Sequence, residues 1–450
     1  MQLWLAAVLA GFLAAAATLG FRLLIDGVEY IVTGRAGSLV SAARTLSPLH
    51  RMATVAAGGL LAGLVLHFGR RWATHGRAGA QHIDYIDAAR TATVVLNDRT
   101  TLSRSASALV SVGTGASIGR EGPMVQMAAW LTSWLARVLP MPPSERNAIL
   151  VCGIAAGIGS AYHAPVAGVV FVLELALGFF ARHTVAPVLI AAATSSTTIY
   201  WFVQPQPLYV MPPVTLVPTS LGVAIAAGVI FGGLGWALLE SLERSRSVFA
   251  RIGSLPARLG LGGVLVGLLS AAVPEVWGNG FSVVSEVLQG NLAWSAVALI
   301  MVAKVAATVI STGSGAIGGV FTPTLFVGAT GGYVVAHAAS SWLGAALVGD
   351  PRVMAVIGMA AVLAAVTHAP LMAIVMVLEM TNQFQLTVPV MLACGVAYAI
   401  STQFGAKPLY GNPIEAHEST AASSRIQSEE AAGHARSSRD EVPIDRVRSR

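Results

Sequence analysis

The stretch Gly119-Arg120-Glu121-Gly122-Pro123 places two adjacent charges inside a mainly apolar part of the chain, between residues 106–110 and 124–135. A charge near the centre of a bilayer costs about 2.5–3.5 kcal/mol on insertion scales, so such residues usually face water or a bound ion. The glycines and the proline interrupt the helix, and interrupted backbone is tolerated at this depth only inside protein or along a cavity. A helix that starts here presents unpaired N–H groups and the positive end of its dipole, which form an anion site.

Glu121 would lie beside this site as a negative charge that competes with the anion. The structural alternative is an ion pair with Arg120 or with another buried partner. Adjacent residues on a helix do not face each other, and the local break favours a site. We therefore expect Glu121 to act on the anion.

The composition is that of a polytopic membrane protein. Of 450 residues, 55% are hydrophobic and 11% are charged, against about 25% charged in soluble domains, and the mean hydropathy is +0.71. Residues 1–24 lack the pattern of a cleavable signal peptide and predict a first span. Cys152 and Cys394 both lie in apolar segments, so neither a disulfide framework nor a metal site is expected. The net charge of +6 does not indicate nucleic-acid binding, because the arginines lie in short loops, as membrane topology requires.

Basic loops predict the orientation. Spans at 3–24 and 52–68 flank a loop at 25–51, and the second span leads to Arg70 and Arg71. A later span at 221–239 is followed by Arg244, Arg246, Arg251 and Arg258. Short basic loops favour the cytoplasm, so the amino terminus and both clusters are predicted inside, although Arg35, Arg44 and Arg51 in the loop between weaken the contrast.

An internal duplication organises the chain. Residues 153–165 read GIAAGIGSAYHAP and residues 358–370 read GMAAVLAAVTHAP, and each His-Ala-Pro is followed by a glutamate, Glu174 or Glu379. A Gly/Pro break lies upstream of each copy, at 122–123 and at 318–323. Matching interrupted segments in two halves are typical of transporters whose site lies at the repeat interface.

We therefore expect an all-α polytopic membrane protein built from two inverted repeats of tilted and broken helices. The repeats are predicted at 1–210 and 211–410, followed by a disordered cytoplasmic tail at 411–450. The segments 147–160 and 353–366 are shorter than the roughly 20 residues of a span, so helices should outnumber the clear hydropathy peaks.

Several polar residues in apolar runs are predicted to have structural roles and not functional ones. Glu174 and Glu379 are predicted to bond backbone N–H groups at helix breaks. His163 and His368 lack metal-ligand spacing and are predicted to satisfy broken helix ends. Lys304 could line a vestibule or extend to an interface.

The sequence resembles the CLC family of chloride channels and proton–chloride exchangers, and its ClcB-like bacterial branch in particular. The resemblance rests on residues 119–123 and 318–323, on both His-Ala-Pro copies and on Lys407-Pro408-Leu409-Tyr410, and it covers nearly the whole chain up to that tyrosine. It implies a voltage-gated anion pathway in each subunit of a homodimer, surrounded by lipid in a bacterial inner membrane. It also implies that chloride or a similar small anion is bound as substrate, with no cofactor and no enzymatic activity.

The resemblance further implies specific roles: gating by Glu121, and anion binding by backbone groups at Arg120 and Gly122, by Val320 N–H, by Phe321 and by the Tyr410 hydroxyl. Backbone and hydroxyl donors suit a path that must also release its anion. The structural alternatives to anion binding are core packing for Phe321 and the role of an aromatic residue at the membrane interface for Tyr410.

One departure from the family concerns the anion. The family usually has Gly-Ser-Gly-Ile-Pro upstream of the gating glutamate, whereas residues 79–85 here read GAQHIDY. Ala80 replaces the serine whose hydroxyl would contact the central anion, and Gln81 N–H remains a candidate donor. The preferred anion is therefore open between chloride, fluoride and nitrate.

A second departure concerns protons. Exchangers commonly carry an inward-facing proton-transfer glutamate directly after the residue that matches Glu174, and this chain has Leu175 there. The missing group favours passive conduction gated by voltage and pH, with lower pH increasing anion flux. Proton-coupled exchange through a non-standard internal route is the alternative.

Two other classes are disfavoured. A membrane-embedded hydrolase needs a nucleophile with a base, and Ser117 near the break has no accompanying histidine motif. A permease for an organic solute would share the inverted repeats but would line its cavity with more polar and aromatic side chains.

Overall fold

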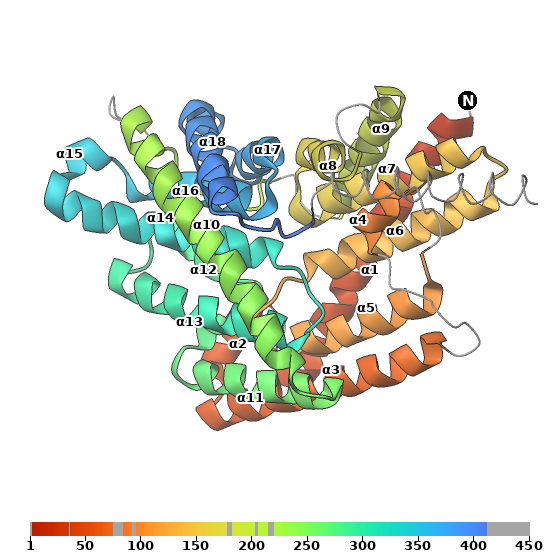
Figure 1. The fold of residues 1–450 in the computed structure, drawn as a ribbon, viewed down its shortest axis with the longest axis horizontal. Coiled ribbons are helices and arrows are strands. Elements are labelled where there is room, and N and C mark those ends of the chain that lie inside the picture. The colour runs from red at the N-terminus through yellow and green to blue at the C-terminus, as the bar shows by residue number, and fades with distance from the viewer. Residues whose placement is uncertain are drawn as a thin grey trace, which may run out of the picture.

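The computed structural model describes residues 2–35, 37–74, 84–91, 96–177, 182–202, 206–214 and 220–411, and this part of the chain is almost entirely helical (Figure 1). The first half contains α1 (Gln2–Thr33), α2 (Leu39–Thr45), α3 (Pro48–Thr74), α4 (Tyr85–Arg90), α5 (Asp98–Gly113), α6 (Glu121–Val138), α7 (Pro143–Tyr162), α8 (Pro165–Phe171), the π-helical turn η1 (Val172–Leu177) and α9 (Arg182–Tyr200). The second half contains α10 (Ser220–Ala250), α11 (Leu255–Ala272), the 3-10 turn η2 (Pro274–Val276), α12 (Phe281–Leu288), α13 (Trp294–Ser314), α14 (Phe321–Leu343), α15 (Ala345–Val348), α16 (Pro351–Thr367), α17 (Pro370–Thr381), η3 (Phe384–Leu386) and α18 (Thr387–Gln403).

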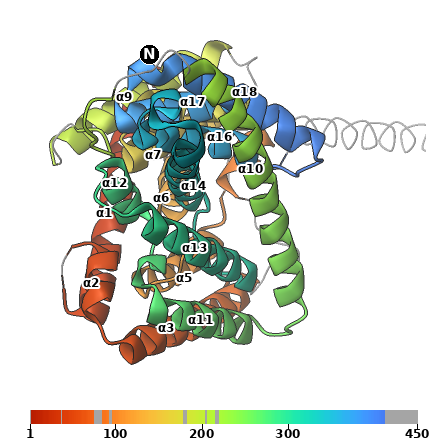
Figure 2. The ribbon, with the colours of Figure 1, turned by 90° about the vertical axis from the view of Figure 1, so that its left-hand side faces the viewer.

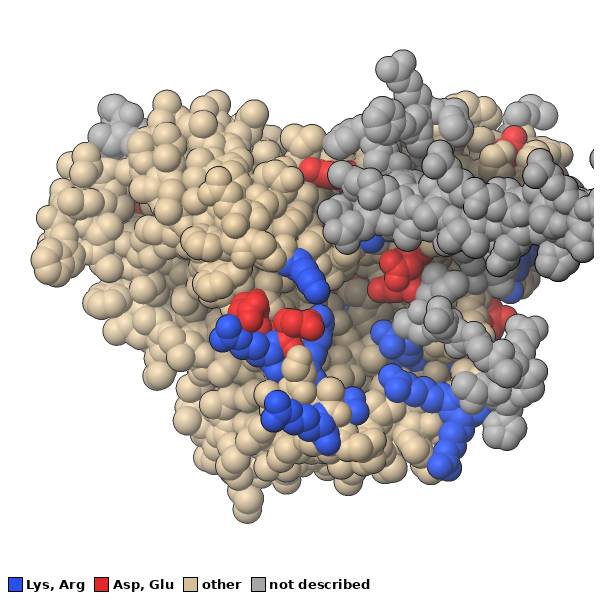
Figure 3. Space-filling view, viewed as in Figure 1, with Lys and Arg blue, Asp and Glu red and all other residues tan. Residues whose placement is uncertain are grey.

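Six helical segments of the described chain are long and apolar enough to cross a membrane, and further apolar helices are too short to do so. The helices therefore outnumber the clear spans, as predicted. On the face drawn in Figure 3, charged side chains gather in the middle and towards the right, while the left-hand flank carries almost none. A flank without charges is suited to contact with lipid.

Two predicted boundaries are wrong. The first helix continues past residue 24 to Thr33, so the predicted loop at 25–51 is largely helical and includes α2. Its polar residues Asp26 and Glu29 line a cavity, so they do not have to end the helix. Similarly, α10 continues past residue 239 to Ala250 because its arginines extend beyond the apolar part.

The His-Ala-Pro motif has the same conformation in both copies. His163 and His368 end α7 and α16 in the left-handed region, with φ of 54° and 55°, and their N–H groups donate to carbonyls of the last turn. The alanine before each proline lies outside the helical region, with φ of −133° and −126° and ψ of 74° and 76°, and a following proline disfavours the helical region for this residue. The proline is the first residue of the next helix, where its missing N–H costs nothing. The predicted role of both histidines at broken helix ends is confirmed.

The two glutamates that follow these motifs join the halves reciprocally. Glu379 on α17 accepts hydrogen bonds from the N–H groups of Val166 and Ala167 at the start of α8, at 3.1 and 2.7 Å. Glu174 accepts the equivalent bonds at the start of α17, from Leu371 and Met372 at 3.2 and 2.7 Å. Each carboxylate satisfies the unpaired donors of a helix in the other half, which confirms the predicted structural role.

The halves also meet at their upstream breaks. Gly119 and Gly319 each donate an N–H to the carbonyl of the other, both at 2.7 Å, as an isolated antiparallel bridge. Helices α6 and α14 begin two residues after these glycines. This reciprocal pairing is what two inverted repeats produce at their axis. In Figure 1 α14 lies on the left and α6 on the right, and in Figure 2, turned by 90°, α14 lies in front of α6. The boundary near residue 210 stays a prediction.

Close packing of small residues holds α14 in place. A Cβ atom on Gly328 would lie 2.2 Å from the carbonyl oxygen of Gly358, and one on Gly332 would lie 2.2 Å from that of Met354. Such backbone contact between α14 and α16 is typical of helix pairs in membranes. It fixes the position of α14 against α16, and the candidate site lies at the start of α14.

Candidate functional site: a carboxylate between two cavities

Glu121 is the first residue of α6, and its side chain is buried, with 6% exposed. It directly follows the pairing of Gly119 with Gly319, so it lies where α6 and α14 both start. The first N–H groups of these helices have no partner within the helix. A carboxylate and a small anion would compete for this position, because both are favoured at a helix N-terminus.

The two carboxylate oxygens of Glu121 have different surroundings. Oε1 accepts a hydrogen bond of 2.6 Å from Nδ2 of Asn279. Oε2 is buried and has no hydrogen-bond partner among the described residues. The guanidinium of Arg120 extends instead to Asp26 on α1, at 3.4 Å, so the structure offers no support for an Arg120–Glu121 ion pair.

Cavities lie on both sides of Glu121. The inner cavity, so named from the predicted orientation, has a volume of about 390 Å³ and includes Gly122, Gly319 and Val320 in its lining. Its charged lining residues are Asp84, Arg70, Arg104 and Arg246. Both basic clusters predicted to be cytoplasmic thus contribute to this one cavity.

The outer cavity also measures about 390 Å³, and its charged lining residues are Arg22, Asp26, Glu29, Arg35 and Arg120. A smaller cavity of about 80 Å³ shares Arg120, Asn279 and Phe281 with it and reaches Glu121. The carboxylate therefore stands between two cavities that are both rich in arginine. Arginines outnumber carboxyl groups in both linings, three to one in the inner cavity and three to two in the outer cavity, and an excess of positive charge raises the local concentration of anions.

Aromatic rings surround the start of α14. Phe321 is 3% exposed and its ring centroid lies 4.9 Å from that of Tyr162, at the end of α7. Tyr410 lines the inner cavity together with Val320, and its ring meets Phe171 edge-on at 5.8 Å. Of the predicted site residues, Val320 and Tyr410 thus line one cavity, and Glu121 and Phe321 are the first residues of α6 and α14.

Leu175 lies in the π-helical turn η1, beside Glu174, and is 2% exposed. Its carbonyl oxygen accepts a hydrogen bond of 2.9 Å from Nε of Arg90. Its side chain offers no proton to the inner cavity. Within the described lining of that cavity the one carboxyl group is Asp84.

Asp84 caps α4 by accepting a hydrogen bond of 2.7 Å from Tyr85 N–H. Burial raises the pKa of its carboxyl group. Tyr85 and Tyr410 line the same cavity. These three side chains form a polar group on the inner side of Glu121.

Two polar residues of the site were missed or wrongly placed from the sequence. Asn279 lies in Trp-Gly-Asn-Gly, which signals a turn but says nothing of what the turn faces. Lys304 neither lines a vestibule nor extends to an interface, because it is fully buried. Its Nζ donates to the carbonyls of Val276 and Gly278 at 2.8 and 2.6 Å.

Ala80 and Gln81, two of the predicted anion-binding positions, lie outside the described residues.

Comparison with known proteins agrees with this geometry. The family model described as voltage gated chloride channel matches residues 58–402. A protein of Ralstonia nicotianae described as ClcB-like is 45% identical over 90% of this chain and 95% of its own length. The voltage-gated ClC-type chloride channel ClcB of Salmonella typhimurium is 37% identical over 92% of this chain and 99% of its own length. The solved structure of a slow cyanobacterial Cl⁻/H⁺ antiporter has a TM-score of 0.80 at 23% identity, over 94% of this chain and 98% of the other.

The chain therefore belongs to the CLC family of anion transport proteins. Within that family it falls in the ClcB-like bacterial branch, as its resemblance predicted. The prediction of an integral, multi-pass protein of a bacterial inner membrane is likewise confirmed.

Proposed function

We propose that this chain carries chloride, or a similar small anion, across the membrane in exchange for protons, with Glu121 as the gate. The observation that carries the proposal is the place of the Glu121 carboxylate, where two helices begin and between two arginine-lined cavities. A deprotonated carboxylate there occupies the position that an anion needs. Protonation or anion competition displaces it and opens the path.

The anion ligands in this proposal are groups without full charge. Backbone N–H groups at Arg120, Gly122 and Val320 come from the starts of α6 and α14. Phe321 and the hydroxyl of Tyr410 complete the site towards the inner cavity. Such dipolar donors hold a weakly hydrated anion and still release it.

Two observations support exchange over passive conduction. The chain shares its fold with a Cl⁻/H⁺ antiporter along nearly its full length. The lining of the inner cavity also includes a partly buried carboxyl group, that of Asp84, together with Tyr85 and Tyr410. We propose that protons pass between the inner solution and Glu121 by way of Asp84, which takes over the task that a glutamate at position 175 would have.

Passive, voltage-gated conduction is the second candidate, and Leu175 favours it. A buried leucine at the position of the usual proton-transfer glutamate interrupts the standard route. In either function voltage acts on Glu121 and on the anion, because moving one charge across the membrane is worth about 2.3 kcal/mol per 100 mV. We also propose the homodimer of the family, with one path in each subunit.

The test is chloride efflux from liposomes containing the purified protein, with external pH recorded under a potassium potential set by valinomycin. Exchange predicts that chloride leaves while protons move into the liposomes against their gradient. Chloride efflux without proton movement would establish passive conduction and refute the exchange. Protein-free liposomes, and liposomes with the Glu121→Ala variant, give the leak and the uncoupled flux.

A further inference from the structure

Asn279 makes the one side-chain hydrogen bond to Glu121 within the described part of the chain, 2.6 Å from Nδ2 to Oε1. The two residues are far apart in sequence and come from different halves of the protein. Asn279 also lines both the outer cavity and the smaller cavity that reaches Glu121. It therefore lies on the anion path, on the outer side of the carboxylate.

The orientation of the Asn279 amide is fixed by a second contact. Its Oδ1 accepts a hydrogen bond of 3.1 Å from the N–H of Phe281, at the start of α12. An amide oxygen accepts and an amide nitrogen donates, so the oxygen faces Phe281 and the NH₂ group faces Glu121. The side chain thus presents a donor, which fits a carboxylate in this place.

The backbone on either side of Asn279 is held firmly. Gly278 and Gly280 have φ of 68° and 92°, values that residues other than glycine rarely adopt. The fully buried Lys304 donates to the carbonyls of Val276, Trp277 and Gly278, at 2.8, 3.3 and 2.6 Å. Three ammonium protons thus meet three carbonyls immediately before Asn279.

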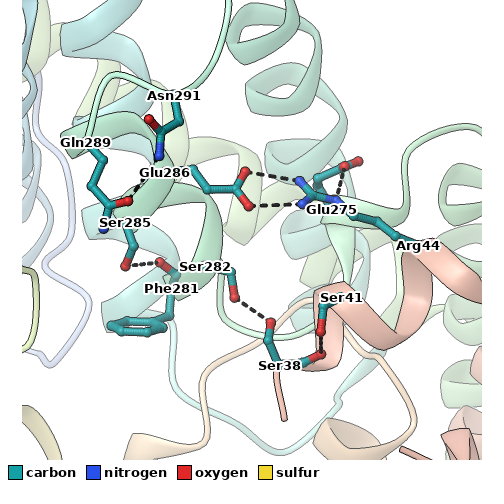
Figure 4. Close-up of polar contacts among 10 residues, drawn as sticks. All are labelled: Ser38, Ser41, Arg44, Glu275, Phe281, Ser282, Ser285, Glu286, Gln289 and Asn291. Atoms are coloured by element: carbon teal, nitrogen blue, oxygen red, sulfur yellow. Dashed lines mark hydrogen bonds and ion pairs between the residues drawn. The ribbon is translucent and has the colours of Figure 1, made fainter.

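A polar cluster on the other side anchors the same segment (Figure 4). Arg44 on α2 binds Glu275 at 2.9 Å and both oxygens of Glu286 at 2.9 and 3.1 Å. Ser38 and Ser282 form a hydrogen bond of 2.7 Å. Residues 275–286 are therefore tied to α2 before and after Asn279, and the amide has a rigid support.

From this geometry we propose that Asn279 is a positioning residue of the gate, which holds the Glu121 carboxylate in the closed position. Opening breaks the bond between Nδ2 and Oε1 and leaves the amide donor facing the anion path. Asn279 thereby sets how readily a proton or an anion displaces Glu121. The inference rests on the proposed role of Glu121 as gate.

Other charged and titratable groups near Glu121 do not depend on the Asn279 amide for their contacts. Arg120 is paired with Asp26, and Arg22 and His163 line the smaller cavity. Tyr162, Tyr209 and Tyr410 interact electrostatically with Glu121 from three other segments. A change at position 279 leaves these groups chemically unaltered, and a comparison of an aspartate with a serine at this position separates the loss of the amide donor from the added negative charge.

The test is the pH dependence of anion flux in liposomes for the Asn279→Asp variant. Aspartate keeps the acceptor for Phe281 N–H but replaces the NH₂ donor with an oxygen, so the support is retained and the bond to Glu121 is lost. We expect the midpoint of the pH–flux curve to move to higher pH by about one unit or more, a tenfold change in the ratio of closed to open gates. Asn279→Ser, which also lacks the amide donor, should move it in the same direction by less, since it adds no negative charge.

The matched control is Asn291→Asp. Asn291 donates to Gln289 at an exposed position after α12, 3.0 Å from Nδ2 to Oε1, so the same change there should leave the curve in place. In a Glu121→Ala background, flux should be independent of pH, and adding Asn279→Asp should not change it further.

The outcomes separate the two proposals. If Glu121→Ala removes the pH dependence but both Asn279 variants follow the wild-type curve, the positioning role is refuted and the gate stands. A shift produced by Asn279→Asp in the Glu121→Ala background would also refute it, because the amide would then act on something else. If Glu121→Ala keeps the wild-type pH dependence, the gate itself is refuted.

Discussion

Gly119 and Gly319 are joined by two backbone hydrogen bonds, one in each direction and both 2.7 Å long. These two glycines come from equivalent breaks in the two halves, and each lies two residues before the start of a helix, α6 or α14. The bridge leaves no room for a side chain on the Glu121 side. A Cβ atom on Gly119 would lie 2.3 Å from Glu121 Oε2 and 3.0 Å from the Gly319 carbonyl oxygen.

Gly119→Ala should therefore displace the gate. The end of the Glu121 side chain moves more cheaply than the backbone, so we expect higher anion flux at neutral pH and a weaker pH dependence. Liposome flux between pH 4 and 8 measures this. Gly395→Ala is the control, because a Cβ there meets nothing within 4 Å. Wild-type flux from a folded Gly119→Ala protein would contradict the geometry of the closed gate.

The reciprocal carboxylates predict a stability effect. Glu379→Gln replaces one accepting oxygen with an NH₂ group, which leaves an N–H at the start of α8 without its acceptor. We expect a loss of about 1–3 kcal/mol in the free energy of unfolding, measured by unfolding in detergent. Glu174→Gln should have a similar effect on α17.

The control for these variants is Glu240→Gln, which removes an exposed pair with Arg244 and should cost less than about 1 kcal/mol. Because both carboxylates act where α8 meets α17, the double variant should depart from additivity. Equal stability of Glu379→Gln and wild type would show that the carboxylate does not hold α8.

Asp84 tests the inner proton route. Burial raises the pKa of its carboxyl group, so it holds a proton at higher pH than an exposed aspartate and can release it to the inner cavity. Asp84→Asn keeps the acceptor that caps α4, since asparagine is an equally good N-cap. We expect proton movement to fall at least tenfold while anion flux continues. Asp87→Asn on the same helix, with its side chain 63% exposed, should leave both fluxes unchanged, and undiminished proton movement in Asp84→Asn would exclude this route.

Lys304 supports the segment that carries Asn279. Lys304→Met leaves three buried carbonyls without their donor, and we expect a loss of about 2–4 kcal/mol in unfolding free energy. Because the support for Asn279 is weakened, the pH–flux curve should also move to higher pH. Arg251→Met removes an exposed cation and serves as the control. A stable variant with an unchanged curve would show that the segment holds its shape without the ammonium.

The sequence predicted the parts of this structure that depend on local chemistry. His-Ala-Pro sets a left-handed helix end, a residue outside the helical region and a new helix start within three residues, so both copies could be located without tertiary information. The charges in residues 119–123 could be assigned to a polar path because lipid does not tolerate them. The duplication, together with the orientation of the basic loops, then predicted two inverted repeats with a binding site at their interface.

The partners of the polar side chains were decided by the tertiary structure. Glu174 and Glu379 were expected to bond helix ends, but nothing local indicated that each would serve the other half. The contact between Asn279 and Glu121 could not be predicted, because it forms where a turn of the second half reaches the first half. Lys304 was wrongly predicted to lie in a vestibule or at an interface. Hydropathy reflects its charge, but it contains no information on the three carbonyl groups that accept its hydrogen bonds. Adjacent residues set the local conformation of the backbone, whereas the donor or acceptor of a buried polar group is set by the packing of segments far apart in the chain.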